Sequence, residues 1–282
     1  MQVPGHGAHR ASGHRSIRFA GIAVLGLTLA VGGFAATPSP TAAAGQVKVV
    51  IVVGPVESNT ARYKDHARGY AALARSLGAS VTEVYSPYAT WTRVKAAAQG
   101  ANIFIYLGHG NGSPSPYGAF SPLRRNGMGL NSSSGNGNSN VKYWGQTYVK
   151  TLGLATNSVV LLNHLCYASG NSEPGHPTPS KSTAMLRADG YGTGFLRSGA
   201  KAVFANGRGS LSSVLTDLLT SDKSVATIFT TDWSFSGERD FTFASTKTPG
   251  STVWMDPYAK GKYYKSVNGR LSLTATQVRA GG

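Results

Sequence analysis

Short apolar runs alternate with amphipathic segments along most of the chain. The apolar runs are rich in Val, Ile and Leu and stop at turn-forming residues, which is typical of buried parallel strands. They occupy residues 46–53, 81–85, 103–107, 159–165 and 201–205. The segments with helical spacing are 60–77, 90–99, 141–152, 183–195, 211–219 and 224–229. This alternation predicts an α/β fold, a three-layer α/β/α sandwich with a mostly parallel sheet and right-handed crossovers.

The C-terminal part of the chain has a different pattern. Its apolar stretches are short, aromatic and β-prone, and Asn268-Gly269 is a strong hairpin-turn signal. The predicted strands are 242–244, 252–255, 263–267 and 271–274. We therefore expect an α/β domain over residues 45–231 and a β-rich appendage over residues 232–282 that packs on the edge of the sheet.

The first 44 residues have the composition of a secretory signal peptide. Arg10, Arg15 and Arg18 precede an uncharged apolar stretch at 19–36, and small residues follow at 41–44. Cleavage after Ala44 fits this pattern best, and cleavage after Ala35 is the second choice. The alternative is an uncleaved membrane anchor, because the apolar stretch is about the minimum length for a bilayer span. With cleavage, the mature protein would be secreted or held at the cell surface without a transmembrane span.

A long polar segment, 111–140, interrupts the regular pattern. It is rich in Gly, Ser and Asn, and its composition predicts that it cannot bury enough apolar area to order itself. Loops of this length in compact domains are usually functional or mobile. Two interpretations stay open: a lid or wall of a substrate cleft, and a mobile insertion.

Two apolar runs each end at a chemically reactive side chain. The run 103–107 leads into His109-Gly110, and the run 159–165 leads into Cys166, the single cysteine of the chain. Ligands of α/β sheets bind at the carboxyl ends of the strands. If these two strands are neighbours, His109 can take the proton of the Cys166 thiol, as nucleophilic catalysis requires. The alternatives are a turn histidine bonded to the backbone and a cysteine that is only a small buried residue.

The two blocks resemble those of the caspase-like clan of cysteine peptidases, which includes caspases, metacaspases, legumains and gingipains. The similarity covers residues 47–207 and rests on an apolar block that ends in His-Gly and a second that ends in Cys. Ser169-Gly170 follows the cysteine and is similar to the Ser-Gly turn of metacaspases and legumains, but it lies one residue further from the cysteine than in the closest pattern. The resemblance implies that His109 is the general base and Cys166 the nucleophile. It also implies that the amides of Gly110 and Cys166 form the oxyanion hole.

The chain departs from the family pattern near the cysteine. His164 and Leu165 stand where family members often have a short polar or acidic residue and a small one. Specificity in this clan depends on one substrate side chain, so a basic side chain would need an acidic partner. The candidates for such a pocket are Glu57 and Glu173, in loops above the sheet, while Arg208 would instead select an acidic side chain.

Cofactor and metal signals are weak. His164 and Cys166 share one face of a strand and could bind a metal with His109 or His176, but no ligand pair has zinc-site spacing. Gly-x-Ser-x-Gly is absent from the sequence, and so is a dinucleotide-binding glycine motif after the first strand. We therefore expect neither a cofactor nor a metal.

The chain is strongly basic. Without the three arginines of the signal segment, 24 basic residues stand against 11 acidic ones, a surplus of +13. Dispersed cations of this kind favour either a solubilising surface or attraction to an anionic envelope polymer. No nucleic-acid motif is visible.

The two blocks and the resemblance together predict a secreted cysteine peptidase or transpeptidase that acts on a peptide or protein substrate. The alternative is a catalytically silent domain that binds an anionic cell-surface polymer.

Overall fold

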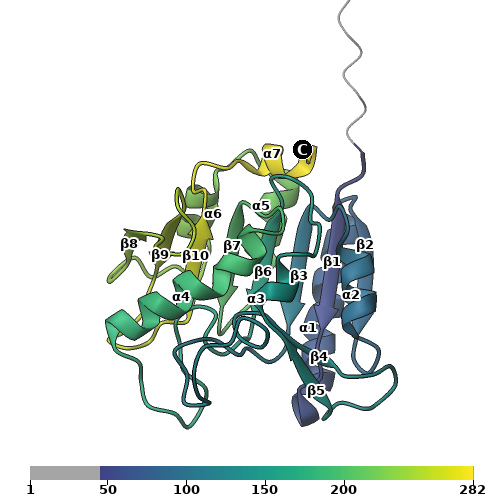
Figure 1. The fold of residues 1–282 in the computed structure, drawn as a ribbon. Helices are drawn as coiled ribbons and strands as arrows, with labels where there is room; N and C mark the ends of the chain where they lie inside the picture. The colour runs from purple at the N-terminus through teal and green to yellow at the C-terminus, as the bar shows by residue number, and fades with distance from the viewer. Residues whose placement is uncertain (1–44, 282) are drawn as a thin grey trace, which may run out of the picture. The chain divides into compact units, whose positions relative to one another are not determined.

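The computed structural model describes residues 45–281, and its centre is one eight-stranded sheet (Figure 1). The strand order is β2-β1-β3-β6-β7-β10-β9-β8. Pairing is parallel from β2 to β7 and antiparallel from β7 to β8. The strands are β1 Lys48–Val53, β2 Ser80–Tyr85, β3 Ile103–Leu107, β6 Val159–Asn163, β7 Ala202–Asn206, β8 Phe241–Ala244, β9 Thr252–Met255 and β10 Lys265–Gly269.

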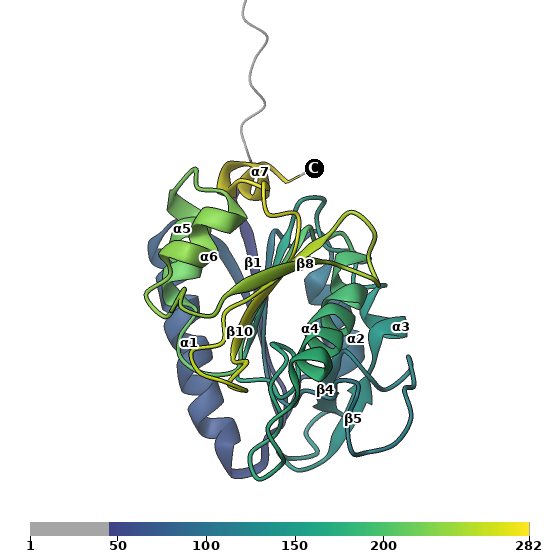
Figure 2. The same cartoon turned by 90° about the vertical axis from the view of Figure 1, so that its left-hand side faces the viewer.

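Helices cover both faces of this sheet, so the predicted three-layer α/β/α fold is confirmed (Figure 2). One face packs against α1 Thr60–Ser76, α5 Ser212–Thr220, α6 Val225–Thr231 and α7 Ala275–Ala280. The other face packs against α2 Trp91–Ala98, α3 Gln146–Val149 and α4 Lys181–Leu196. Strands β3, β6 and β7 are buried along their whole length, which explains their continuous apolar runs.

The predicted signal segment, residues 1–44, lies outside the described residues. In the part of the chain that the structure describes, no helix combines the length and the apolar character that a membrane crossing needs.

The expected helix at 141–152 is wrong for its first half. Residues Val141–Trp144 form strand β5, which pairs antiparallel with β4, Met128–Asn131, in a separate two-stranded sheet. Only the short helix α3 follows. The segment Val-Lys-Tyr-Trp contains a β-branched residue and two aromatic ones, and these β-prone side chains favour a strand once a partner is present.

The expectation that segment 111–140 cannot order itself is also wrong. Met128 and Leu130 of β4 are fully buried in the core beneath the sheet. The buried Tyr106 hydroxyl donates to the carbonyl of Gly129 at 2.9 Å and accepts from its amide at 2.9 Å. The segment is therefore attached to the end of β3 by packing and by hydrogen bonds to a core tyrosine.

The C-terminal strands continue the central sheet. Asn268 and Gly269 lie inside β10, opposite Val203 and Ala202 of β7, so the predicted hairpin turn at this dipeptide is wrong. Gly269 has φ of 142°, and a Cβ atom there would lie 2.1 Å from the Lys201 carbonyl oxygen. The glycine thus allows the backbones of β10 and of the segment before β7 to approach closely, which is one reason for a glycine inside a strand. Residues 271–274 form no strand and lead into α7.

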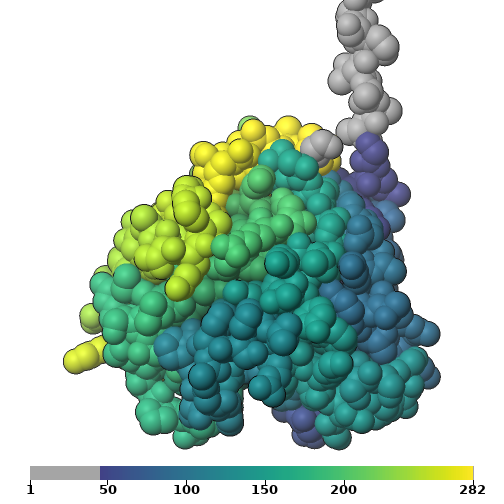
Figure 3. All heavy atoms as spheres, in the orientation of Figure 1, coloured from purple at the N-terminus to yellow at the C-terminus, as the bar shows by residue number. Residues whose placement is uncertain are grey.

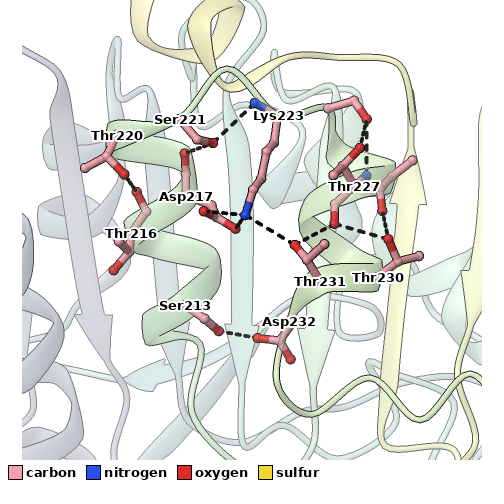
Figure 4. Close-up of polar contacts among 12 residues, drawn as sticks. Ser213, Thr216, Asp217, Thr220, Ser221, Lys223, Thr227, Thr230, Thr231 and Asp232 are labelled. Carbon is pink, nitrogen blue, oxygen red and sulfur yellow. Dashed lines mark hydrogen bonds and ion pairs between the residues drawn. The ribbon is translucent and has the colours of Figure 1, made fainter.

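Polar contacts join the region around residue 232 to its neighbours (Figure 4). Lys223 donates to both carboxylate oxygens of Asp217, at 3.0 and 2.9 Å, and Ser213 donates to Asp232. The Asp232 carboxylate also forms a buried ion pair with Lys265 of β10. Burial opposes ionisation of Asp232, but hydrogen bonds from Lys265, Ser213 and Ser234 more than offset it and lower the pKa of Asp232. This pair connects α6 to the C-terminal strands.

Candidate active site

Strands β3 and β6 are neighbours, as the sequence-based hypothesis requires. They pair in parallel, with Leu107 opposite Asn163, so the segments that carry His109 and Cys166 leave the sheet at the same edge. Gly110 lies directly against the backbone of Cys166: a Cβ atom at position 110 would be 2.0 Å from the Cys166 carbonyl oxygen. Only glycine fits there, which gives the His-Gly pair a steric reason.

The residues at this edge surround a cavity of about 410 Å³. It is lined by Val56, Glu57, Asn59, Tyr63, Gly108, His109, Gly110, Tyr117, Tyr143, His164, Cys166, Glu173 and Pro174. In Figure 3 the surface is indented along the lower edge, the end of the sheet where β1 and β3 terminate in Figure 1. Five of the predicted residues therefore share one cavity: His109, Gly110, Cys166, Glu57 and Glu173.

The imidazole of His109 is hydrogen-bonded to Glu57. Its Nε2 lies 3.1 Å from Oε2 and 3.4 Å from Oε1 of that carboxylate, and 30% of the His109 side chain is exposed. Because an ionised carboxylate can only accept hydrogen bonds, Nε2 carries the hydrogen and Nδ1 is left as a proton acceptor. Glu57 is the first residue of the 3-10 turn Glu57–Asn59 that follows β1, which brings its carboxylate to the end of β3.

The thiol of Cys166 is partly buried, and its surroundings disfavour the thiolate. Burial, and secondarily the carboxylate of Glu173, raise the pKa of Cys166 to about 12. Over residues 45–281 the thiol is in no disulfide, and the ring of His109 hydrogen-bonds to Glu57 rather than to the sulfur. The thiol is thus protonated at neutral pH, and it needs a base before it can act as a nucleophile.

Gly110 and Cys166 both line the cavity, and each has a backbone amide that could donate to a substrate. Within residues 45–281, neither Gly110 N–H nor Cys166 N–H donates a backbone hydrogen bond. Both belong to residues that line the cavity, and the two backbones are in contact at Gly110. Paired free amides are the donors that stabilise a developing oxyanion in acyl transfer.

Glu173, which also lines the cavity, is held by aromatic and basic neighbours. Its Oε2 accepts from the Tyr117 hydroxyl at 2.8 Å and lies 3.7 Å from His176 Nε2. Tyr117 itself is 58% exposed at the mouth of the cavity. The loop that carries Glu173 is fixed from below by buried Arg187, which donates to Asn171 O and to Pro114 O. Segment 111–140 and the loop after Cys166 are therefore tied together as cavity walls.

His164 lies in the same cavity but in different surroundings. It has φ of 61°, stacks on Tyr63 with ring centroids 5.4 Å apart, and pairs its Nε2 with His66 Nδ1 at 3.1 Å. Burial, followed by the charges of His66 and Arg62, lowers the pKa of His164 to about 4. The ring is neutral at neutral pH and supports the turn between β6 and Cys166.

Arg208 is placed away from the cavity. Its guanidinium stacks 4.2 Å from the ring centroid of Tyr264 and donates to that hydroxyl. In the described part of the chain, no group of three or more His, Cys, Asp or Glu side chains has the geometry of a metal site.

Three tyrosines of the cavity have no counterpart in the sequence-based list of candidates. Tyr63 comes from the first turn of α1, Tyr117 from the polar segment, and Tyr143 from β5. Tyr63 lies on the apolar face of its helix, so the spacing of apolar residues predicts that it is a core residue and does not indicate a place in the site. Tyr117 and Tyr143 belong to the segments whose structure the pattern did not predict, and no local signal marks them.

Comparison with known proteins gives one structural similarity. No protein-family model matches the chain, and no curated protein matches it. Among solved structures, the chain is similar to a secreted C11 cysteine protease from Bacteroides thetaiotaomicron in complex with an irreversible peptide inhibitor, with 7% sequence identity and a TM-score of 0.36. The alignment covers 75% of this chain and 66% of that chain, slightly less than two thirds of its length. At this level of similarity, function has to be argued from the side chains of the site.

Proposed function

We propose that this protein is a secreted cysteine peptidase or transpeptidase of the caspase-like clan, with Cys166 as nucleophile and His109 as general base. The observation that supports the proposal is one cavity lined by Cys166, His109 and Gly110, in which the amides of Gly110 and Cys166 donate no backbone hydrogen bond within the described residues. The fold adds support, because the cavity lies at the carboxyl ends of adjacent parallel strands.

The proposed reaction begins with proton transfer from the Cys166 thiol to Nδ1 of His109. Sulfur then bonds to the carbonyl carbon of a peptide bond, and the amides of Gly110 and Cys166 stabilise the oxyanion. The C–N bond breaks as His109 returns the proton to the leaving amine, which leaves a thioester on Cys166. Water or a second amine attacks the carbonyl carbon of this acyl-enzyme and gives its proton to His109. The C–S bond then breaks, His109 returns the proton to the Cys166 sulfur, and the product leaves as an acid or with a new peptide bond.

The hydrogen bond of Glu57 to Nε2 gives that residue a positioning role. It fixes the tautomer with Nδ1 unprotonated and would stabilise the imidazolium that forms during the reaction. Glu57 is therefore assigned to the orientation of His109 rather than to binding of a substrate side chain.

A basic substrate side chain fits the charge of the cavity. Two carboxylates line it, and the lining residues include neither Lys nor Arg. With Glu57 bonded to His109, Glu173 is the carboxylate we assign to a Lys or Arg side chain of the substrate. Arg208, engaged with Tyr264, takes no part in this assignment.

The proposal is tested by labelling the protein with a peptide that carries a thiol-directed electrophile. Mass spectrometry should find one adduct, on Cys166, and none in Cys166→Ala. His109→Ala should label far more slowly than the wild type at pH 7. Equal labelling rates for wild type and His109→Ala would remove the general-base assignment.

A second candidate function is a catalytically silent domain that binds an anionic cell-surface polymer. The raised pKa of Cys166, to about 12, favours this alternative, because a protonated thiol in a half-closed site has no reactivity of its own. Absence of any adduct on folded protein, together with polymer binding that weakens steeply with salt, would support it over the peptidase.

A further inference from the structure

A second groove lies along the free edge of the sheet, away from the cavity of Cys166. Strand β2 forms one of the two edges of the sheet and pairs only with β1 (Figure 1). Beside its C-terminal half is a groove of about 570 Å³, which shares no lining residue with the cavity of Cys166. Its walls are Lys64, Arg68, Thr82, Glu83, Val84, Tyr85, Ser86, Pro87, Tyr88, Arg93, Ala96 and Ala97.

The backbone of β2 offers unpaired hydrogen-bonding groups to this groove. The amide of Ser80 donates to the carbonyl of Val47, just before β1, at 2.9 Å, and the amide of Ser86 donates to Val53, the last residue of β1, at 2.8 Å. Because successive peptide groups of a strand point to opposite sides, the N–H groups of Val81, Glu83 and Tyr85 point away from β1. A strand edge with such groups can accept another strand.

Cations from two different helices flank the same edge. Lys64 and Arg68 belong to α1, and Arg93 belongs to α2, and these helices cover opposite faces of the sheet. Within residues 45–281 Lys64 and Arg93 have no ion-pair partner, while Arg68 contacts Asp65 at 2.9 Å. The one acid of the groove, Glu83, is paired with Arg75. The groove therefore has a positive surplus on both faces.

We propose that this groove binds an extended acidic segment of a partner protein, added as a further strand beside β2. Consecutive side chains of an added strand point to opposite faces, so neighbouring carboxylates would meet Lys64 and Arg68 on one side and Arg93 on the other. Affinity would come from main-chain hydrogen bonds to β2, and selectivity from the flanking cations. The apolar floor at Val84, Ala96 and Ala97 and the exposed ring of Tyr88 fit a peptide better than a hydrated polyanion.

The test measures binding of a short fluorescent peptide with consecutive Glu residues to the full mature chain. Lys64→Glu combined with Arg93→Glu should weaken binding roughly tenfold. The matched control reverses two exposed lysines outside the groove, Lys150→Glu with Lys260→Glu, and should change binding by less than about twofold. Circular dichroism of both double variants checks that they fold.

A second probe separates strand addition from simple charge attraction. The same peptide with its backbone amides N-methylated keeps every carboxylate but cannot form the ladder, so its binding should be lost. Equal binding of the methylated peptide would overturn the proposal, and so would an equal loss of affinity in the two double variants. Inorganic polyphosphate is added as a competitor at the same concentration of charge. If it displaces the peptide equally well in the wild type and in the groove variant, the surface binds polyanions in general and the proposal is wrong.

Discussion

Two histidines line the cavity of Cys166, and their surroundings differ in most respects. His109 follows β3 between two glycines, has 30% of its side chain exposed, and hydrogen-bonds to the carboxylate of Glu57. His164 follows β6 in a left-handed conformation, is packed on Tyr63, and contacts His66. Burial lowers the pKa of His164 to about 4.

The difference separates a histidine that can move protons from one that maintains the shape of the site. A carboxylate beside His109 supports the imidazolium that general-base catalysis forms, whereas a half-buried ring beside another imidazole resists protonation. A place in the cavity of the thiol is therefore an insufficient criterion, because both rings line that cavity and only the partner of each ring distinguishes their roles.

The largest expected effect is that of His109→Gln. Loss of the proton acceptor should reduce the rate of labelling by a peptide electrophile at pH 7 by roughly 10²- to 10⁴-fold. The measurement is the second-order inactivation rate by mass spectrometry. The matched change is His164→Asn, in which Asn tolerates the positive φ, and it should reduce that rate by less than about tenfold. Similar losses in the two variants would erase the distinction between the histidines.

Glu57→Gln should have the next largest effect. The amide can present its oxygen or its nitrogen to Nε2, so the tautomer of His109 is no longer fixed and the imidazolium loses its countercharge. We expect roughly a tenfold to hundredfold loss in kcat for a peptide substrate, with KM little changed. An increase in KM alone would instead assign Glu57 to substrate binding.

Glu173→Gln tests the role of the second carboxylate of the cavity in two assays. Hydrolysis of substrates with Lys before the scissile bond should lose roughly tenfold in kcat/KM, while matched substrates with Gln there should change little. The same variant should react roughly threefold faster with a small neutral alkylating agent at pH 8, because its carboxylate no longer raises the pKa of Cys166. Equal losses for Lys and Gln substrates would contradict a role in side-chain selection.

The smallest expected effect concerns stability in acid. The pKa of His164 is 6.5 in the unfolded chain and about 4 in the fold, so protons bind preferentially to the unfolded chain. The contribution of the neutral His164 ring to the free energy of unfolding is complete above pH 6.5 and is lost as the pH falls toward 4. The loss is at most about 2 kcal/mol, because the ring is partly exposed. Urea unfolding between pH 7 and pH 4 should therefore show a smaller decline for His164→Asn than for the wild type, and parallel declines would refute this account.

Much of the parallel half of the fold could be predicted from the sequence. The apolar runs at β1, β3, β6 and β7 are buried on both faces and can only be strands of a covered sheet, and their ends locate His109 and Cys166. The prediction that His109 and Cys166 leave the sheet at the same edge required β3 and β6 to be neighbours, and the strand pairing confirms that they are.

Tertiary contacts determine the parts of the fold and of the site that the sequence pattern does not predict. Val141–Trp144 becomes a strand because β4 lies beside it, and β4 is ordered because the Tyr106 hydroxyl and the core contacts of Met128 attach it to β3. Asn268-Gly269 reads locally as a turn but lies opposite β7 inside a strand. The contact between Glu57 and His109 joins residues 52 positions apart, and no local pattern encodes it.

The pH dependence of inactivation tests most directly the claim that the imidazole of His109 deprotonates the thiol of Cys166. The inactivation rate by the peptide electrophile is measured from pH 5 to pH 10 in the wild type and in His109→Gln. The account predicts that the wild-type rate levels off once the imidazole is neutral, whereas the variant rises by about tenfold per pH unit toward the thiol pKa of about 12. Superimposable profiles in the two proteins would contradict it.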